Sequence, residues 1–269
     1  MQSGSFSVLF VSTEKLCSGS GLAQDERCVY LAGSGSAGSQ LLIFDKATMS
    51  LESKISLTAV SDIHSICLDQ QSIIAASTGS DEVLRVRLDR PDLAEVLWRA
   101  SDRRRDTHHI NSIAWVGDRL FCSAFGPKQN EHWHSARQGY VRDVSGGVFV
   151  LRGIYHPHSI VTCDGEIFVC ESSTSTIVSR SGSRKVLTGY LRGLTFDPNG
   201  SAYVGSSIGR TTTDRPGETL NPADVGESTG RCAVSVIPPA ASIDASIVDL
   251  SQFGAEIYDL IWLEAPSHH

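Results

Sequence analysis

Residues 158–173 read HSIVTCDGEIFVCESS, and this stretch carries the pattern that decides the fold. A polar, a small and an aliphatic residue come first, a turn follows, and an alternating apolar strand then ends in small hydroxyl residues. The first three residues, called the triplet below, recur along the chain, once with an acidic middle residue. The six triplets are Ser20-Gly21-Leu22, His64-Ser65-Ile66, Asn111-Ser112-Ile113, His158-Ser159-Ile160, Arg192-Gly193-Leu194 and Tyr258-Asp259-Leu260.

The spacing of the triplets indicates the fold class. Their last residues are separated by 44, 47, 47, 34 and 66 positions. Repeats of about 40–50 residues that contain several short strands are typical of a β-propeller. Six triplets predict an all-β, six-bladed β-propeller that forms a single domain over residues 1–269, with insertions near 127–147 and 209–230 as loops. A β-sandwich or a smaller barrel is the alternative.

The two ends of the chain suggest how such a ring would close. The last triplet ends nine residues before the last residue of the sequence, which is too few to complete a blade. Residues 6–12 form an apolar run that no triplet precedes. We therefore expect this N-terminal strand to join the C-terminal blade, because a closed ring protects open strand edges.

The composition narrows the class of protein. The 269 residues include 23 Lys and Arg against 30 Asp and Glu, so the formal net charge is −7. A wide nucleic-acid footprint needs a basic face, which this balance does not favour. No apolar stretch reaches the ~18 residues of a membrane span, and the N-terminal apolar run lacks the basic start of a signal peptide. We expect a soluble, cytoplasmic protein that binds neither nucleic acid nor membrane, and we predict no oligomeric state.

The cysteines agree with a reducing compartment. There are seven, and no two of them form a C-x-x-C pair. Most lie in strand-like apolar runs, as Cys67 and Cys122 do. We expect buried free thiols rather than a disulfide framework or a zinc ribbon.

Two positions in each repeat are polar although an apolar strand is about to begin. The first residues of the triplets are Ser20, His64, Asn111, His158, Arg192 and Tyr258. The residues two positions earlier are Ser18, Asp62, His109, His156, Tyr190 and Glu256. Residues two apart share one face of a strand, and the innermost strand of each propeller blade lines the central channel. These positions therefore predict two polar rings at one mouth of the channel.

Three histidines of these rings predict a metal site. His64, His109 and His158 come from three successive repeats, and the prediction requires their nitrogens to approach a common point. Neutral imidazoles suit a divalent transition metal such as Zn, Mn or Fe. Three protein ligands with one open position are typical of a catalytic metal. Asp62 is expected to be a further ligand or to orient His64.

Other residues are assigned to catalysis and to substrate binding. Glu256 or Asp259 is expected to act as general base, with His156 and Tyr190 as further catalytic candidates. Arg192 is expected to bind a carboxylate or a phosphate. The other substrate-binding candidates are Asn111, Tyr258, Arg210 and Trp133, the last of them in a lid or an exposed loop. The structural alternative is that these polar side chains close the channel by hydrogen bonding to loop backbones.

Five groups of residues between positions 62 and 260 also form an ordered set of motifs. They are Asp62-Ile63-His64, Asp106-Thr107-His108-His109-Ile110-Asn111-Ser112-Ile113, Gly146-Gly147-Val148 with Pro157-His158-Ser159, Gly189-Tyr190-Leu191-Arg192-Gly193-Leu194 with Val204-Gly205-Ser206-Ser207-Ile208-Gly209-Arg210, and Glu256-Ile257-Tyr258-Asp259-Leu260. The set resembles the motifs of a family of uncharacterised bacterial six-bladed β-propeller-like proteins, often encoded near exopolysaccharide genes. Ser112 stands where that family has glycine, and Ile160 where it has proline. The resemblance implies the fold and implies no particular reaction.

Two functions from different classes follow from these patterns. The first is an enzyme with a metal-assisted site at the channel mouth, a lyase, isomerase or hydrolase acting on a small polar, carbohydrate-like substrate that can be anionic. The second is a non-catalytic propeller that binds a carbohydrate, a peptide or a partner protein at the same mouth. A stoichiometric transition metal in the purified protein would favour the first.

Overall fold

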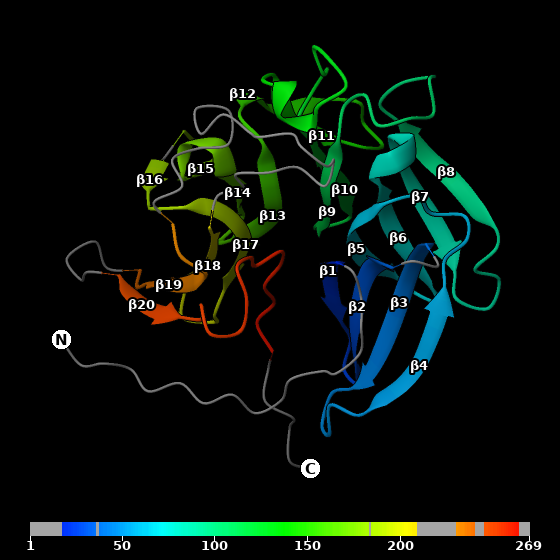
Figure 1. The fold of residues 1–269 in the computed structure, drawn as a ribbon, viewed down its shortest axis with the longest axis horizontal. Helices are drawn as coiled ribbons and strands as arrows, with labels where there is room; N and C mark the ends of the chain where they lie inside the picture. Colours follow the sequence, from blue (N-terminus) through cyan, green and yellow to red (C-terminus); the bar gives the residue numbers. More distant parts are fainter. Residues whose placement is uncertain (1–17, 36–37, 183, 209–229, 240–244, 264–269) are drawn as a thin grey trace.

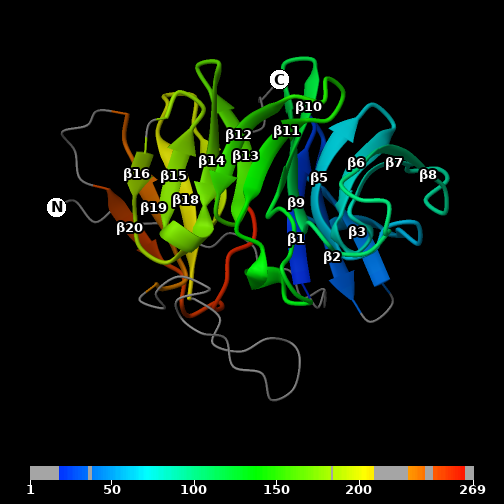
Figure 2. The same cartoon turned by 90° about the horizontal axis from the view of Figure 1, so that it is seen from above.

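Five four-stranded blades surround a central channel (Figure 1). This computed structural model describes residues 18–35, 38–182, 184–208, 230–239 and 245–263. Within these residues, each blade is an antiparallel sheet whose four strands follow one another along the chain. Figure 2 shows the ring from its side, with the strands running between its two faces. The predicted all-β propeller fold is confirmed.

The bounds of the blades follow the repeat. Blade 1 consists of β1 (Ser18–Gln24), β2 (Cys28–Gly35), β3 (Gly38–Asp45) and β4 (Leu51–Ser56). Blade 2 consists of β5 (Ile63–Asp69), β6 (Ser72–Ser77), β7 (Glu82–Arg87) and β8 (Ala94–Arg99), with the 3₁₀ turn η1 (Thr78–Ser80). Blade 3 consists of β9 (Ile110–Val116), β10 (Arg119–Ala124), β11 (Gly139–Asp143) and β12 (Phe149–Ile154), with η2 (Trp133–Ser135). Blade 4 consists of β13 (Pro157–Cys163), β14 (Glu166–Glu171), β15 (Thr176–Ser179) and β16 (Arg184–Val186), with η3 (Ser172–Thr174). Blade 5 consists of β17 (Tyr190–Phe196), β18 (Ala202–Ser207), β19 (Ala233–Ile237) and β20 (Ser246–Asp249).

The motif that opened the sequence is the inner hairpin of blade 4. Asp164 and Gly165 connect β13 to β14, and both have left-handed backbone angles, with φ of 50° and 75°. Two-residue hairpin loops favour this conformation because it matches the twist of the strands, and Asp-Gly adopts it readily. The triplet therefore begins the innermost strand, and the alternating run is the second strand.

The prediction of six blades is wrong, because the described residues form five. The sixth triplet, Tyr258-Asp259-Leu260, belongs to an irregular segment, residues 255–263, rather than to a strand. This segment, red in Figure 1, lies between β1 and β17, where the innermost strand of a sixth blade would lie.

Side chains of the neighbouring blades hold the segment in place of a strand ladder. Ser207 Oγ accepts the Ile257 N–H at 3.0 Å, and Thr195 Oγ1 accepts the Trp262 N–H at 3.2 Å. Ile261 packs against an apolar cluster of blade 1 that contains Val29, Leu42 and Phe44. Because single side chains satisfy its backbone groups, the segment closes this side of the channel without a regular sheet.

Two other expectations concern the ends and the insertions. The N-terminal strand expected at 6–12 lies outside the described residues, as does 209–229 of the second insertion. The first insertion is a loop only as far as Gln138, because residues 139–143 form β11, the third strand of blade 3. The sequence of β11, Gly-Tyr-Val-Arg-Asp, has few apolar residues, so its pattern does not distinguish a strand from a loop.

The apolar core is divided into layers between neighbouring blades. Four clusters of buried side chains lie between blades 1 and 2, 2 and 3, 3 and 4, and 4 and 5. In the first of these clusters, Leu41 of β3 and Ile73 of β6 are fully buried. Each blade therefore depends on its neighbours to remove its apolar faces from water.

In four of the six triplets, the side chain of the middle residue forms a hydrogen bond with the backbone of the next blade along the ring. The pairs are Ser65 Oγ with Ile113 N (3.2 Å), Ser112 Oγ with Ile160 N (3.3 Å), Ser159 Oγ with Gly193 N (3.0 Å) and Asp259 Oδ2 with Leu22 N (2.9 Å). In every pair the side chain accepts a backbone N–H from the following blade, and Asp259 does so across the junction between the C-terminal segment and blade 1. We call these bonds the inter-blade latches.

Glycine takes the middle position of the other two triplets because of close backbone approach. A Cβ on Gly21 would lie 2.9 Å from backbone atoms of Ser65 and Ile66, and a Cβ on Gly193 would lie 2.9 Å from the Asp259 carbonyl carbon. Gly193 also has a φ of +73°, which side chains rarely adopt. These two positions therefore exclude larger residues.

The six cysteines in the described part of the chain are free thiols. Cys122, Cys170 and Cys232 are buried, as expected, whereas Cys28, Cys67 and Cys163 are half-buried. No described helix is both long enough and apolar enough to cross a membrane.

Removal of one latch should destabilise the ring. We expect Ser65→Ala to lower the free energy of unfolding by about 1 kcal/mol, because the buried Ile113 N–H loses its acceptor. Urea denaturation measures this. Ser56→Ala, at an exposed position of the outer strand β4, is the matched control and should stay within about 0.5 kcal/mol of the wild type. Equal unfolding midpoints for both variants would contradict the latch.

The Asp259 latch should make stability depend on pH. Burial raises the pKa of this carboxyl to about 7, against 3.8 as the ordinary value, although two backbone N–H groups oppose the shift. Between pH 4 and 7 the folded protein keeps the Asp259 proton that the unfolded chain has released, so the contribution of Asp259 to the stability should fall as the pH rises. The buried histidines His109, His156 and His158, whose pKa values burial lowers, contribute in the opposite direction. In urea unfolding over that range, the stability of Asp259→Asn should therefore rise more steeply with pH than that of the wild type, whereas Asp164→Asn, in an exposed turn, should follow the wild type.

Candidate functional site

A cavity of about 750 Å³ opens at the end of the channel where the inner strands begin. We call it the mouth cavity. All six first residues of the triplets line it: Ser20, His64, Asn111, His158, Arg192 and Tyr258. Three residues of the second predicted ring, Asp62, His109 and Glu256, line it too. The predicted gathering of these side chains at one mouth therefore occurs.

β-Bulges place the first residues of most triplets in this cavity. In each inner strand the pairing with the second strand shifts register at or next to the triplet. The residues left out of these ladders are Ser20, His64, Asn111, Ser159, Ile160, Arg192 and Gly193. A bulge bends the strand and re-aims side chains, which explains how consecutive triplet residues serve the channel and the latch at once.

The second ring owes its residue types partly to backbone geometry. Asp62, His109 and His156 each precede an inner strand and have left-handed φ angles of 51°, 55° and 53°. Asp and His tolerate this conformation better than most residues. The repeated choice of Asp and His here therefore has a structural cause as well as a chemical one.

Arg192 is the main cationic group of the mouth cavity. It is 6% exposed, and its guanidinium lies over the rings of Tyr258 and Tyr190, at 4.3 and 4.9 Å from their centroids. Nη1 forms an ion pair with Glu256 Oε2 at 3.4 Å. Nε is buried and has no hydrogen-bond partner within the described part of the chain. A buried cation with an unused donor is a ready site for an anion.

On blade 3, His109 is oriented by a carboxylate that the sequence analysis did not select. Asp106 Oδ2 lies 3.2 Å from His109 Nδ1 and 2.9 Å from Lys128 Nζ. Because Nδ1 donates to Asp106, Nε2 of His109 is the acceptor nitrogen. Burial lowers the pKa of His109, although the Asp106 carboxylate opposes the shift. His109 is therefore held as a neutral imidazole with a directed lone pair.

His64 uses both ring nitrogens for neighbouring side chains. Asn111 Nδ2 donates to Nδ1 at 3.2 Å, and Nε2 lies 3.4 Å from Asp62 Oδ1. Burial would raise the pKa of Asp62, but the hydrogen bond and the charge of His64 outweigh it, so this pKa is lowered. Asp62 thus orients His64, which is one of the two roles predicted for it. Asp62 carries a negative charge.

The predicted three-histidine metal site does not form. The ring of Phe125 lies against both His109 and His158, at centroid distances of 4.5 and 5.2 Å, and keeps them apart. His158 Nδ1 bonds to the His156 carbonyl and to Ser172 Oγ. Among the described residues, no three His, Cys, Asp or Glu side chains are placed to hold a metal ion. The residues therefore do not fit the metal as we assigned it, and the ion itself stays a prediction.

His156 and Tyr190, predicted as catalytic, lie behind the cavity wall. His156 is 2% exposed, donates through Nε2 to the Ala136 carbonyl, and stacks on Phe125. Burial lowers the pKa of His156 to about 3. Tyr190 is buried beneath Arg192. Both side chains support the wall, and neither lines the mouth cavity in the described structure.

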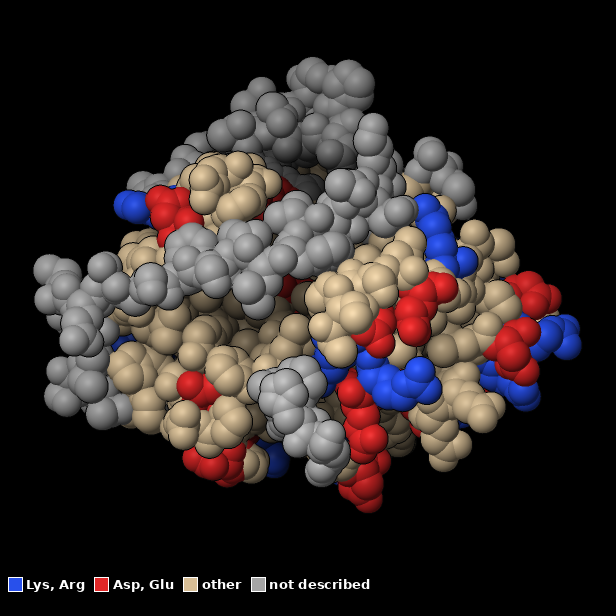
Figure 3. Space-filling model, turned by 90° about the horizontal axis from the view of Figure 1, so that it is seen from below, with Lys and Arg blue, Asp and Glu red and all other residues tan. Residues whose placement is uncertain are grey.

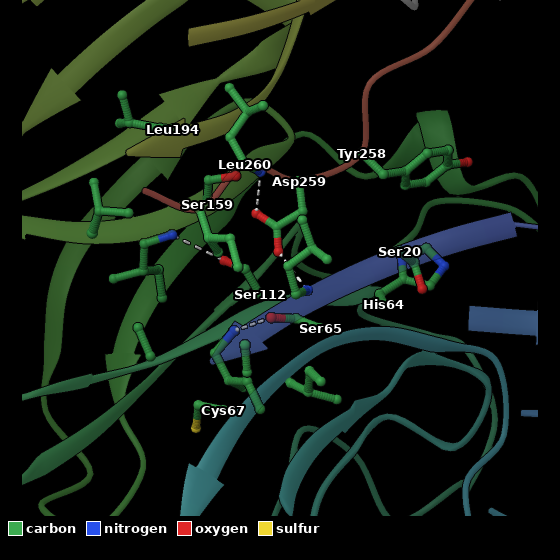
Figure 4. Close-up of a pocket in the computed structure, with 18 of the residues that line it drawn as sticks. Ser20, His64, Ser65, Cys67, Ser112, Ser159, Leu194, Tyr258, Asp259 and Leu260 are labelled. Atoms are coloured by element: carbon green, nitrogen blue, oxygen red, sulfur yellow. Dashed lines mark hydrogen bonds between the residues drawn. The ribbon is translucent and has the colours of Figure 1, made fainter. Parts of the chain in front are cut away.

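Asp259 does not share a cavity with Glu256. It lines a second space of about 400 Å³ deeper in the channel, shown in Figure 4 with Ser65, Ser112 and Ser159 on the neighbouring strands. Its two carboxylate oxygens accept the N–H groups of Leu22 and Leu260, both at 2.9 Å. Asp259 therefore lies outside the mouth cavity, where its carboxylate joins the C-terminal segment to blade 1, and its role as general base stays a prediction.

The remaining candidates divide between the cavity wall and the undescribed part of the chain. Trp133 of η2 lines the mouth cavity, with its ring centroid 6.1 Å from that of Phe125. Arg210 lies outside the described residues. Asp106, Phe125 and Lys128 are site residues that the sequence patterns did not indicate. The spacing of Asp106 three residues before His109 was a usable signal, whereas Phe125 and Lys128 follow β10 with no distinguishing pattern.

Surface charges of both signs are interspersed on the face seen in Figure 3. Neighbouring exposed residues such as Arg87 and Asp89 form ion pairs, with 2.6 Å between Nη2 and Oδ2. Such pairs leave little net field on the surface. The mouth cavity differs from this surface because it gathers Arg192, Asp62, Asp106 and Glu256 around one space.

Solved structures share the fold at low sequence identity. A chain of a nidogen/laminin complex is 14% identical with a TM-score of 0.62, and the match covers 89% of this chain and 82% of that one. The luciferin-regenerating enzyme is 10% identical with a TM-score of 0.66, over 92% and 80% of the two chains. Virginiamycin B lyase from Staphylococcus aureus is 9% identical with a TM-score of 0.52, over 90% and 73%. These similarities show the propeller fold alone.

A search of the curated proteins found no match to the sequence. A family model described as a domain of unknown function (DUF4915) matches residues 37–268. The resemblance seen in the motifs, to a propeller family without an assigned reaction, agrees with this match. Because the match covers most of the chain, the protein belongs to the DUF4915 family.

Proposed function

We propose that the mouth cavity binds a small anionic, carbohydrate-like molecule and that Arg192 binds its anionic group. The observation that carries the proposal is the buried guanidinium with an unpartnered Nε on the cavity wall. An unsatisfied buried donor costs about 1–3 kcal/mol, which a bound anion would recover. The volume of about 750 Å³ lies in the range of small-molecule sites.

The other walls suit a sugar-like ring. Trp133 and Phe125 supply apolar ring faces, while Asn111 supplies a hydrogen-bonding amide. A sugar presents apolar C–H faces together with hydroxyl groups around its edge, so it matches a wall of both kinds. Most small-molecule sites combine aromatic side chains with a few placed polar groups.

We further propose that the protein is a lyase or an isomerase in which His109 is the general base. Its Nε2 lone pair would take a proton from the carbon next to the substrate carboxylate, and Arg192 would stabilise the negative charge that develops on the carboxylate oxygens. In an isomerase, a proton from solvent then adds to the other face of that carbon, and His109 releases its proton to solvent. A lyase instead expels a leaving group from the next carbon as the double bond forms. No step is assigned to a metal.

Binding without catalysis is the second candidate. Propellers of similar fold include the luciferin-regenerating enzyme and a chain of a nidogen/laminin complex, so the fold does not decide between the classes. Several cavity side chains also have structural partners, as His158 does with Ser172. The cytoplasmic location expected from the sequence stays a prediction.

Anion binding can be tested by calorimetry with D-glucuronate, D-galacturonate and D-gluconate against D-glucose. We expect at least one acid to bind more tightly than glucose, and Arg192→Gln to weaken that binding by about 10- to 100-fold through loss of a charged partner. Arg87→Gln removes an exposed arginine and should bind as the wild type does. If no acid binds, or if both variants bind equally, the proposal fails.

Catalysis can be separated from binding by hydrogen exchange. With a bound sugar acid in D₂O, the wild type should replace the C–H proton next to the carboxylate with deuterium, which removes its ¹H NMR signal. His109→Gln should abolish exchange and keep binding, while His132→Gln, outside the cavity, should exchange normally. Wild-type protein that binds the acid without exchange would favour the non-catalytic function.

A further inference from the structure

The charged groups of the mouth cavity are separated across the channel. Arg192 belongs to blade 5, whereas Asp62 and His64 belong to the start of blade 2. Blades 3 and 4 lie between them on one side of the ring, and blade 1 with the segment 255–263 lies between them on the other (Figure 1). One wall of the cavity therefore carries a cation and the opposite wall carries a carboxylate.

The carboxylates of the cavity differ in how they are neutralised. Asp106 pairs with Lys128 at 2.9 Å, and Glu256 pairs with Arg192 at 3.4 Å. Asp62 has the imidazole of His64 as its ion-pair partner and no lysine or arginine in the described part of the chain. Its side chain is 51% exposed. Asp62 is therefore the accessible carboxylate on this wall that pairs with no described lysine or arginine.

A second acceptor on the same wall lacks a donor. Oδ1 of Asp106 is buried and has no hydrogen-bond partner among the described residues, while Oδ2 accepts from both His109 and Lys128. One unused acceptor thus lies on this wall, and the unused donor Arg192 Nε lies on the wall formed by blade 5. A ligand that carries only an anion would satisfy one wall and leave the other unsatisfied.

We propose that the ligand of the mouth cavity is a zwitterion, an amino-sugar acid whose carboxylate binds Arg192 and whose ammonium group binds Asp62. This inference rests on the proposed function and specifies its substrate class. In a 2-amino uronic acid the amino group and the carboxylate are attached to opposite corners of the six-membered ring, so one molecule presents its two charges in opposite directions. Trp133 and Phe125 lie on the blade 3 side between the two charged walls, where they would contact the ring itself.

A matched pair of ligands tests the inference. The probes are 2-amino-2-deoxy-D-glucuronate and D-glucuronate, which differ only in one ammonium group against one hydroxyl group. Calorimetry at pH 6.5, where the amine is protonated, should show about tenfold tighter binding of the amino compound by the wild type, as for a charged hydrogen bond at a half-exposed site.

The variant Asp62→Asn tests which residue is responsible. Asn tolerates the left-handed conformation of this position (φ 51°), so the backbone should be kept. The variant should bind both probes with the affinity that the wild type has for D-glucuronate. Asp89→Asn, at an exposed ion pair, is the matched control and should keep the tenfold preference.

Three outcomes would overturn the inference in distinguishable ways. Equal binding of both probes by the wild type would reject the zwitterion and leave anion binding intact. A tenfold preference that persists in Asp62→Asn would reject Asp62 as its cause. Binding of neither probe by the wild type would reject the proposed function together with the inference.

Discussion

The latch between one triplet and the next blade is the interaction on which the ring depends. Each inner strand has one edge paired within its blade and another edge that faces the central channel. The hydroxyls of Ser65, Ser112 and Ser159 accept N–H groups at that second edge, so polar backbone groups near the channel are satisfied without a continuous sheet. Asp259 makes the same bond to Leu22 and joins the last segment to the first blade.

The latch also explains why the site lies where it does. The middle residue of the triplet must reach the next blade, while its neighbours continue the strand. A β-bulge reconciles the two demands and turns the first residue toward the channel. Residues such as His64 and Asn111 are therefore free to vary in chemistry, because the structural bond is made by the position after them. The scaffold presents one variable side chain from each repeat to a single cavity.

The cavity differs from the metal centre expected from its histidines. Phe125 separates His109 from His158, and each of these imidazoles is fixed by a separate partner, Asp106 and Ser172. What remains is a polar chamber in which one wall carries the buried guanidinium of Arg192 paired with Glu256, and the opposite wall carries Asp62 and Asp106. Such an arrangement binds and orients a charged small molecule, and a neutral His109 with a directed lone pair can add proton transfer.

The sequence by itself determined the repeat, the propeller class and the set of residues at the channel mouth, because periodicity and strand alternation are local properties. It could not determine the number of blades, since the sixth triplet has the residue pattern of a strand and lacks a strand partner. It could not separate Asp259 from Glu256 either, because three residues along an irregular segment suffice to reach a different cavity. Tertiary structure decided these points, together with the roles of Phe125 and Lys128, since they depend on which side chains from different blades meet.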